Sequence, residues 1–165
     1  MPTTITGTDG VSQVQTGAVE SGDLPAGSVI QVVQVTSTTN TDTTATSLID
    51  VEPSVTITPS SSSNKILVMH TAGGMIQGVA SSIKFELQRN NTTIWTANRY
   101  GYKNNTDWAP IPFHASYLDS PNTTSSITYN FAMQQQDNTD LRHNSDDANY
   151  NGTSEAITIA MEIAG

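Results

Sequence analysis

Apolar and polar residues alternate with a period of two along much of the chain, which is typical of strands with one buried and one solvated face. The alternation is clearest in three segments, 83–88, 127–134 and 157–163. In the last of these, isoleucines and Met161 occupy every second position, so we expect them to face inward and Glu162 to face water. No segment of useful length has the 3.6-residue period of an amphipathic helix.

Six further segments favour strands less regularly: 29–35, 46–51, 55–58, 65–71, 92–98 and 112–118. Within 65–71, the run Ile66–Met69 is apolar on both faces, which predicts a central strand with something packed on each side. Asn90 and Asn91 separate two of the strands, and asparagine tolerates the left-handed backbone of a two-residue hairpin. About nine short strands with such turns predict an all-β fold, an antiparallel β-sandwich of jelly-roll type.

The first 27 residues scatter isolated apolar residues among Thr, Gly, Ser and Asp and show no core pattern. We therefore divide the chain into an N-terminal arm, 1–27, and a sandwich domain, 28–165. The arm is either a leader that is ordered only locally or a segment that becomes ordered on another subunit. In the strand that follows, Val29, Val33 and Val35 lie opposite Ile30 and Val32, which predicts a seam between copies of the chain.

The charge of the chain narrows the range of its partners. Fifteen acidic and six basic residues give a net charge of −9, which would repel a phosphate backbone, so we expect no nucleic-acid partner.

The chain has no cysteine, so neither a disulfide bond nor a thiolate metal site is available. No apolar run is long enough to span a bilayer, and the N-terminus lacks the pattern of a signal peptide, so we expect no membrane insertion.

The sequence contains no recognisable catalytic motif. His70, His114 and His143 are far apart and lack metal-ligand spacing, so we expect them to be structural or exposed. Three carboxylates could in principle pair for glycoside hydrolysis, but Glu86, Glu155 and Glu162 are predicted to lie on solvent faces or at a strand edge. We therefore expect no enzymatic activity, no catalytic residues, no metal and no cofactor.

The segment 99–108, expected to be a loop, gathers aromatic and amide side chains that suit a glycan: Tyr100, Tyr102, Asn104, Asn105 and Trp108. Aromatic faces stack on sugar rings, and amides bond their hydroxyls, but aromatics also favour protein interfaces. The alternative is that Trp108 and one tyrosine cover the end of the sandwich or a trimer seam. A second loop, 137–151, is rich in Asp and Asn. It lacks EF-hand spacing, so we favour an acidic solvated loop over a Ca²⁺ site.

Four passages resemble a β-domain that recurs in tail-fibre and related virion proteins of tailed bacteriophages: Thr4–Gly10 with Val14 and Gln15, Gly27–Val33, Tyr117–Thr124 with Ile127–Tyr129, and Ile159–Ala164. The resemblance covers nearly the whole chain and consists of strand and turn patterns. It implies a homotrimer, a place at a fibre tip or as decoration, and no catalysis. The chain has no repetitive shaft, which leaves a short fibre, a knob or a capsid ornament.

We therefore expect a non-enzymatic virion protein, a subunit of a short tail fibre or fibre knob that contributes to host attachment. The alternatives are a capsid decoration protein, either cement or head fibre, and a carbohydrate-binding module. Expected partners are further copies of the chain, other virion proteins through the arm, and a host surface glycan. The expected location is the surface of the phage particle, on its tail or its capsid.

Overall fold

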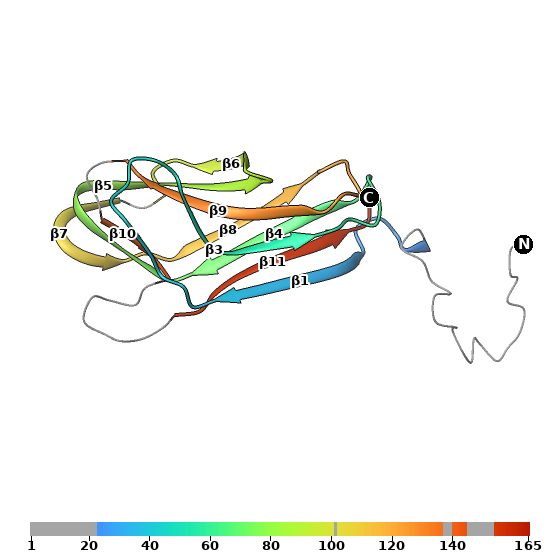
Figure 1. The fold of residues 1–165 in the computed structure, drawn as a ribbon, viewed down its shortest axis with the longest axis horizontal. Helices are drawn as coiled ribbons and strands as arrows, with labels where there is room; N and C mark the ends of the chain where they lie inside the picture. The colour runs from blue at the N-terminus through green and yellow to red at the C-terminus, as the bar shows by residue number, and fades with distance from the viewer. Residues whose placement is uncertain (1–22, 101, 137–139, 145–153) are drawn as a thin grey trace, which may run out of the picture.

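The computed structural model describes residues 23–100, 102–136, 140–144 and 154–165, with the backbone alone for 79–81 and 102–106. These residues form eleven strands (Figure 1): β1 Val29–Ser37, β2 Thr41–Thr43, β3 Ile49–Ile57, β4 Lys65–Ala72, β5 Gly74–Arg89, β6 Thr92–Ala97, β7 Tyr102–Pro110, β8 Phe113–Asp119, β9 Ile127–Gln135, β10 Asp140–His143 and β11 Ala156–Ile163. The predicted all-β class is confirmed. The segments predicted at 46–51 and 55–58 join in one strand, β3.

The strands make two antiparallel sheets that pack face to face (Figure 1). The four-stranded sheet has the order β1-β11-β4-β8, and the seven-stranded sheet contains β3-β9-β5-β6, with β2, β10 and β7 alongside the first half of β5. Leaving out β2, β7 and β10, the remaining eight strands can be numbered one to eight along the chain. The four-stranded sheet then has the order 1-8-3-6, and the facing strands of the other sheet have the order 2-7-4-5. This is the arrangement of a jelly roll with two Greek keys. The predicted jelly-roll type is therefore correct.

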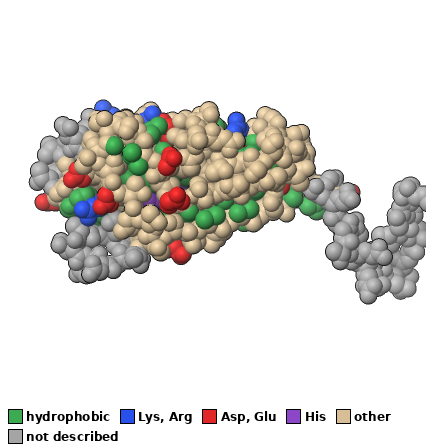
Figure 2. Space-filling model, in the orientation of Figure 1, with side chains coloured by type: hydrophobic (Ala, Val, Ile, Leu, Met, Phe, Trp, Pro, Cys, Tyr) green, Lys and Arg blue, Asp and Glu red, His purple; other side chains and the backbone are tan. Residues whose placement is uncertain are grey.

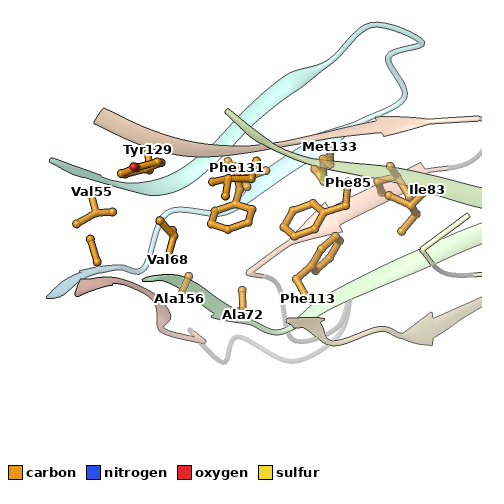
Figure 3. Close-up of a cluster of buried hydrophobic side chains, with 14 of the residues drawn as sticks. Val55, Val68, Ala72, Ile83, Phe85, Phe113, Tyr129, Phe131, Met133 and Ala156 are labelled. Atoms are coloured by element: carbon orange, nitrogen blue, oxygen red, sulfur yellow. The ribbon is translucent and has the colours of Figure 1, made fainter. Parts of the chain in front are cut away.

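Apolar side chains from both sheets fill the space between them (Figure 3). Phe85 and Phe131 stack with ring centroids 5.2 Å apart, and Phe113 from the opposite sheet packs against Phe85, also at 5.2 Å. These rings and Tyr129 are fully buried. In two of the three clearest alternating segments, 83–88 and 127–134, the larger apolar residues face inward as predicted. Each such side chain removes a large apolar surface from water, which makes this cluster the main source of stability.

The hairpin between β5 and β6 confirms the turn predicted from sequence. Arg89 pairs with Thr92 across a two-residue loop, and Asn90 and Asn91 have φ angles of 47° and 64°. Two consecutive left-handed residues are what a two-residue hairpin with the right-handed strand twist needs. The aromatic segment 99–108, by contrast, is not a loop as predicted, because β7 occupies most of it and pairs with β5.

Three polar side chains tie the two sheets together at one end of the sandwich. Arg89 donates from Nη1 to both oxygens of Asp119, at 3.1 and 2.9 Å, and the hydroxyl of Tyr129 donates to Asp119 Oδ2 at 2.7 Å. Asp119 ends β8 in the four-stranded sheet, whereas the two donors lie in the other sheet. The nearly buried carboxylate therefore has both charge and hydrogen-bond partners, which offsets the cost of its burial.

Candidate functional site

Strand β11 faces the opposite way from the prediction. Its small or polar residues Ala156, Thr158, Ala160 and Glu162 are buried, while the residues between them, Ile157, Ile159, Met161 and Ile163, lie half-buried on the outer side of the sheet. The inner side of β11 faces β3 at close range, where alanine and threonine fit. The strand and its alternation were predicted correctly, but the side that faces inward was not, because the larger apolar side chains lie on the outer side of the sheet.

The neighbouring strands extend this apolar surface. The register aligns Val32, Met161, Leu67 and Leu118 in one row across β1, β11, β4 and β8. Val32 and Leu118 are 55% and 49% exposed. Within the described residues this surface, which we call the apolar outer face, comprises Val29, Val32, Leu67, Met69, Leu118, Ile157, Ile159, Met161 and Ile163.

Charge separates the two outer surfaces of the sandwich. Of the described positions on the outer side of the four-stranded sheet, only Lys65, beside Ile163, carries a full charge, and none is Asp or Glu, although the chain has a net charge of −9. The outer side of the seven-stranded sheet is polar, with Asp50, Lys84, Gln88 and Gln134 on it. Figure 2 shows apolar side chains in a row along the edge of the molecule that carries β1. Contiguous exposed apolar surface of this kind marks an interaction site.

The three valines predicted as a seam occupy different sides of β1. A bulge between Val29 and Gln31 shifts the alternation, so Val29 is 51% exposed and shares the outer side with Val32. Val33 and Val35 pack against the core. The sequence could not place the bulge, because a one-residue shift exchanges the two faces of a strand. Contact between copies of the chain at Val29 stays a prediction, and Val32 lies on the same side of the strand.

The five residues predicted to bind a receptor do not form one cluster among the described side chains. The Tyr100 ring stacks on Phe113 at 5.9 Å, and its hydroxyl bonds the backbone of His114, so this side chain serves the fold. Trp108 lies on β7 and lines a hollow of about 250 Å³. Tyr102, Asn104 and Asn105 lie in β7, but their side chains are outside the described set, as is most of the loop 137–151.

Residues of two other segments, which sequence reasoning did not connect with Trp108, complete the hollow around it. It is lined by Asp42, Thr43, Thr44, Trp108, Asp140, Leu141 and Arg142. The Arg142 guanidinium carbon lies 4.1 Å from the centre of the indole ring, and Arg142 Nε lies 3.6 Å from Asp42 Oδ2. The pairing of β2 with β10 brings these polar residues together, and neither short strand has an alternation long enough to predict.

Two of the three histidines meet in the core, which their spacing did not predict. Nε2 of His70 and Nε2 of His143 are 2.9 Å apart, and His70 Nδ1 lies 2.8 Å from Thr158 Oγ1. Because the Thr158 hydroxyl donates to the Pro53 carbonyl at 2.7 Å, it must accept from His70 Nδ1–H. His70 Nε2 is then the acceptor for His143 Nε2–H, and both rings are neutral.

Burial agrees with this assignment. Desolvation, with the adjacent His143 and then His114, lowers the pKa of His70 to about 3, and desolvation lowers the pKa of His143 to about 4. Both side chains are closed off from water, at 1% and 0% exposure. His143 Nδ1 is buried without a hydrogen-bond partner in the described structure. The pair links β4 to β10 across the two sheets and presents no nitrogen to a substrate from solution.

Glu162 is fully buried, which corrects its predicted solvent position. Its carboxylate accepts hydrogen bonds from Gln31 Nε2, from the backbone N–H and hydroxyl of Ser60, and from Asn64 Nδ2, at 2.6 to 2.8 Å. Burial alone would raise the pKa of Glu162, but these donors together hold it below its ordinary value. The carboxylate thus fastens β1 and the loop after β3 to β11.

Glu86 is also buried, at 2% exposure, although it too was expected on a solvent face. Its carboxylate pairs with Lys84 and accepts hydrogen bonds from Thr93 at 2.7 Å and Thr96 at 3.3 Å. Both threonines lie on β6, which the sequence pattern did not place over this carboxylate. Glu86 and Glu162 have all their close partners inside the fold, and Glu155 alone of the three predicted carboxylates is exposed.

Neither a metal cluster nor a membrane-spanning helix occurs in the part of the chain that the structure describes. No group of three or more His, Asp or Glu side chains there could hold a metal ion. No helix of the described residues is long and apolar enough to cross a bilayer.

No protein-family model matches the chain, and no curated protein matches its sequence. Among solved structures, it is similar to the VP2 subviral particle of infectious bursal disease virus, with a TM-score of 0.42 and 13% identity over 82% of this chain and 33% of that chain. The Gx strain of the same virus gives a TM-score of 0.36 at 13% identity, over 82% and 37%. The chain thus spans about a third of these neighbours. At such TM-scores the likeness does not bear on its function.

Proposed function

We propose that this chain is a non-enzymatic structural subunit of a virus particle, which works as a homo-oligomer joined through the apolar outer face. The observation that carries the proposal is the reversed orientation of β11, which sets Ile157, Ile159, Met161 and Ile163 outside the core. A sandwich that stayed single in water would gain nothing from these four residues in place of polar ones. Their burial against another surface would contribute roughly 25 cal/mol for each Å² removed from water.

Charge favours a second copy of the chain as the partner. Two chains of net charge −9 repel each other through most of their surfaces. The apolar outer face has no described carboxylate, so two copies can approach there without placing like charges together. An identical partner also supplies a matching apolar surface, as expected for a symmetric oligomer.

At a finer level, we propose a trimeric short tail fibre or fibre knob of a tailed bacteriophage, in which the arm 1–27 docks onto other virion proteins. The jelly-roll topology and the resemblance of four sequence passages to phage fibre domains support this choice. A capsid decoration protein is the alternative, and it would use the same face. Immunogold labelling of particles that carry the protein tests the choice, because label on the tail supports the fibre and label on the head contradicts it.

Sedimentation velocity of the purified chain and two variants tests the oligomer itself. The chain should sediment at three times its mass of 17.6 kDa. Val32→Asp and Leu118→Asp place a carboxylate on the apolar outer face, at side chains that are about half exposed and contribute little to the core. Both variants should sediment as monomers with an unchanged circular dichroism spectrum.

Thr92→Asp is the matched control, because Thr92 is an exposed residue at the start of β6 on the opposite sheet. It should leave the oligomer intact. A monomeric parent chain would contradict the proposal, and so would a trimer that survives both substitutions on the apolar outer face.

A further inference from the structure

The hollow around Trp108 is lined by residues in or next to β2, β7 and β10, and none of them belongs to the apolar outer face. Figure 1 shows β7 and β10 at one end of the sandwich. Figure 2 shows acidic and basic side chains next to an apolar one at this end. The volume of about 250 Å³ is near the lower end of the roughly 300–1,000 Å³ of ligand pockets. It therefore suits one ring-sized group.

An aromatic platform forms one wall of the hollow. The Trp108 indole is half-buried, and the Arg142 guanidinium lies 4.1 Å from its centre, which holds both planar groups in place. Arg142 is paired with Asp42 on β2, and Leu141, next to it on β10, is fully buried. Side chains that are fixed before a ligand arrives lose little entropy when it binds.

Hydrogen-bonding groups around this platform have spare capacity. The contact between Arg142 Nε and Asp42 Oδ2, at 3.6 Å, is longer than a hydrogen bond, so guanidinium N–H donors remain available. Asp140 is exposed at the rim, and its carboxylate has no hydrogen bond or ion pair with any side chain that the structure describes. An aromatic face, free acceptors and a free donor therefore converge on one ring-sized space.

We propose that this hollow binds one neutral pyranose unit of a glycan. The apolar face of a sugar ring would pack against the indole of Trp108 beside the stacked guanidinium, adjacent hydroxyls would donate to Asp140, and the N–H groups of Arg142 would donate to a ring or hydroxyl oxygen. Two carboxylates and one guanidinium give the hollow a net negative charge, so acidic sugars are repelled. The proposal does not depend on the oligomer, because the residues of the hollow come from a single chain.

The two tryptophans of the chain allow a direct assay. In a Trp95→Phe background, Trp108 is the only indole, so its fluorescence reports on the hollow. The methyl pyranosides of glucose, galactose and mannose, together with N-acetylglucosamine, should be titrated, and glucuronate serves as the acidic counterpart of glucose. At least one neutral sugar should change the emission with saturation in the millimolar range, and glucuronate should not.

Asp140→Asn removes the carboxylate at an exposed position and should weaken this binding at least tenfold, whereas Glu155→Gln, an exposed carboxylate outside the hollow, should not change it. Trp108→Ala, followed by saturation-transfer NMR, should abolish it. The proposal is overturned if none of the neutral sugars binds, if glucuronate binds equally well, or if Asp140→Asn has no effect. Failure here leaves sedimentation unchanged, so it is distinguishable from failure of the proposed oligomer.

Discussion

His70 and His143 share one hydrogen bond, 2.9 Å between their Nε2 atoms, across the interface of the two sheets. Because His70 already donates through Nδ1 to Thr158, a neutral His70 accepts this bond at Nε2, and burial lowers the pKa of both rings, which favours their neutral forms. A proton added to either ring would place a charge between Phe131 and Phe113, which pack against His70 and His143 with centroids 4.7 and 5.2 Å away. The charged and titratable groups nearest the pair are the histidines themselves and His114.

The first prediction is that the protein loses stability in mild acid. The unfolded chain binds protons on these histidines near pH 6.5, whereas the folded chain binds them only near pH 4 and 3. The free energy of unfolding should therefore fall as the pH drops below 6.5, by up to about 1.4 kcal/mol per pH unit for each histidine. Urea unfolding at intervals between pH 7 and 5 measures the slope.

A histidine variant tests whether the buried pair causes this change of stability with pH. His143→Gln, which keeps a donor toward His70, should reduce the slope by one proton. A free energy of unfolding that is flat between pH 7 and 5 would show that the rings are not held neutral.

The second prediction concerns the buried carboxylate of Glu162. Glu162→Gln keeps one oxygen for the donors of Ser60 and Asn64 but puts an amide NH₂ opposite Gln31 Nε2, so a donor would face a donor there. The substitution should cost roughly 1.5–3 kcal/mol in the free energy of unfolding at pH 7. Glu155→Gln, on an exposed residue, is the control and should cost almost nothing. Equal stabilities of the two variants would mean that the donors do not depend on the carboxylate.

The third prediction concerns the hydroxyl of Tyr129. Tyr129→Phe keeps the buried ring but removes the donor to Asp119 at 2.7 Å, leaving only Arg89 on that carboxylate. A hydrogen bond to a charged group contributes about 1.5–3 kcal/mol, and the variant should lose that much on denaturant unfolding. Tyr117→Phe, whose hydroxyl bonds no described residue, should unfold like the parent chain. A loss in both variants would point to the rings and not to the bond.

The fourth prediction is that the arm is dispensable for folding. The first described backbone bonds to the sandwich come from Gly27, whose N–H donates to the Ala164 carbonyl at 2.8 Å, and from Ala164 to Ser28. Deletion of residues 2–22 should leave the strand content in circular dichroism and the number of copies in the oligomer unchanged, and it should abolish incorporation into particles. A truncated chain that is unfolded, or that still enters particles, contradicts the role of the arm.

Period-two alternation was enough to predict the fold class, because it locates strands and Asn90-Asn91 marks a hairpin. It could not predict which side of a strand faces inward where both sides are apolar or where a bulge intervenes. In β11 the larger residues mislead, since the interior there has space only for Ala156, Thr158 and Ala160. Glu162 misleads in the same way, because its donors come from segments about 100 or more residues away in sequence.

The candidate sites were harder to predict for a related reason. Trp108 was singled out from local composition, but the carboxylates and the arginine beside it belong to β2 and β10, which are brought together by pairing across the sheet. Tyr100 has the composition of a binding residue, yet its hydroxyl bonds the backbone of His114. Both results depend on contacts between segments that are far apart in the sequence, and a local stretch of residues does not reveal such contacts.

The difference between the two outer surfaces of the sandwich would also limit the size of the proposed oligomer. A chain with an apolar binding surface on both sides would add copies indefinitely and form a filament. Among the described residues one side is apolar, and the opposite side carries Asp50 and Lys84. Once the apolar sides of a few copies had closed on one another, the described surface left outside would be polar, and growth would end. The proposed assembly is therefore expected to be finite.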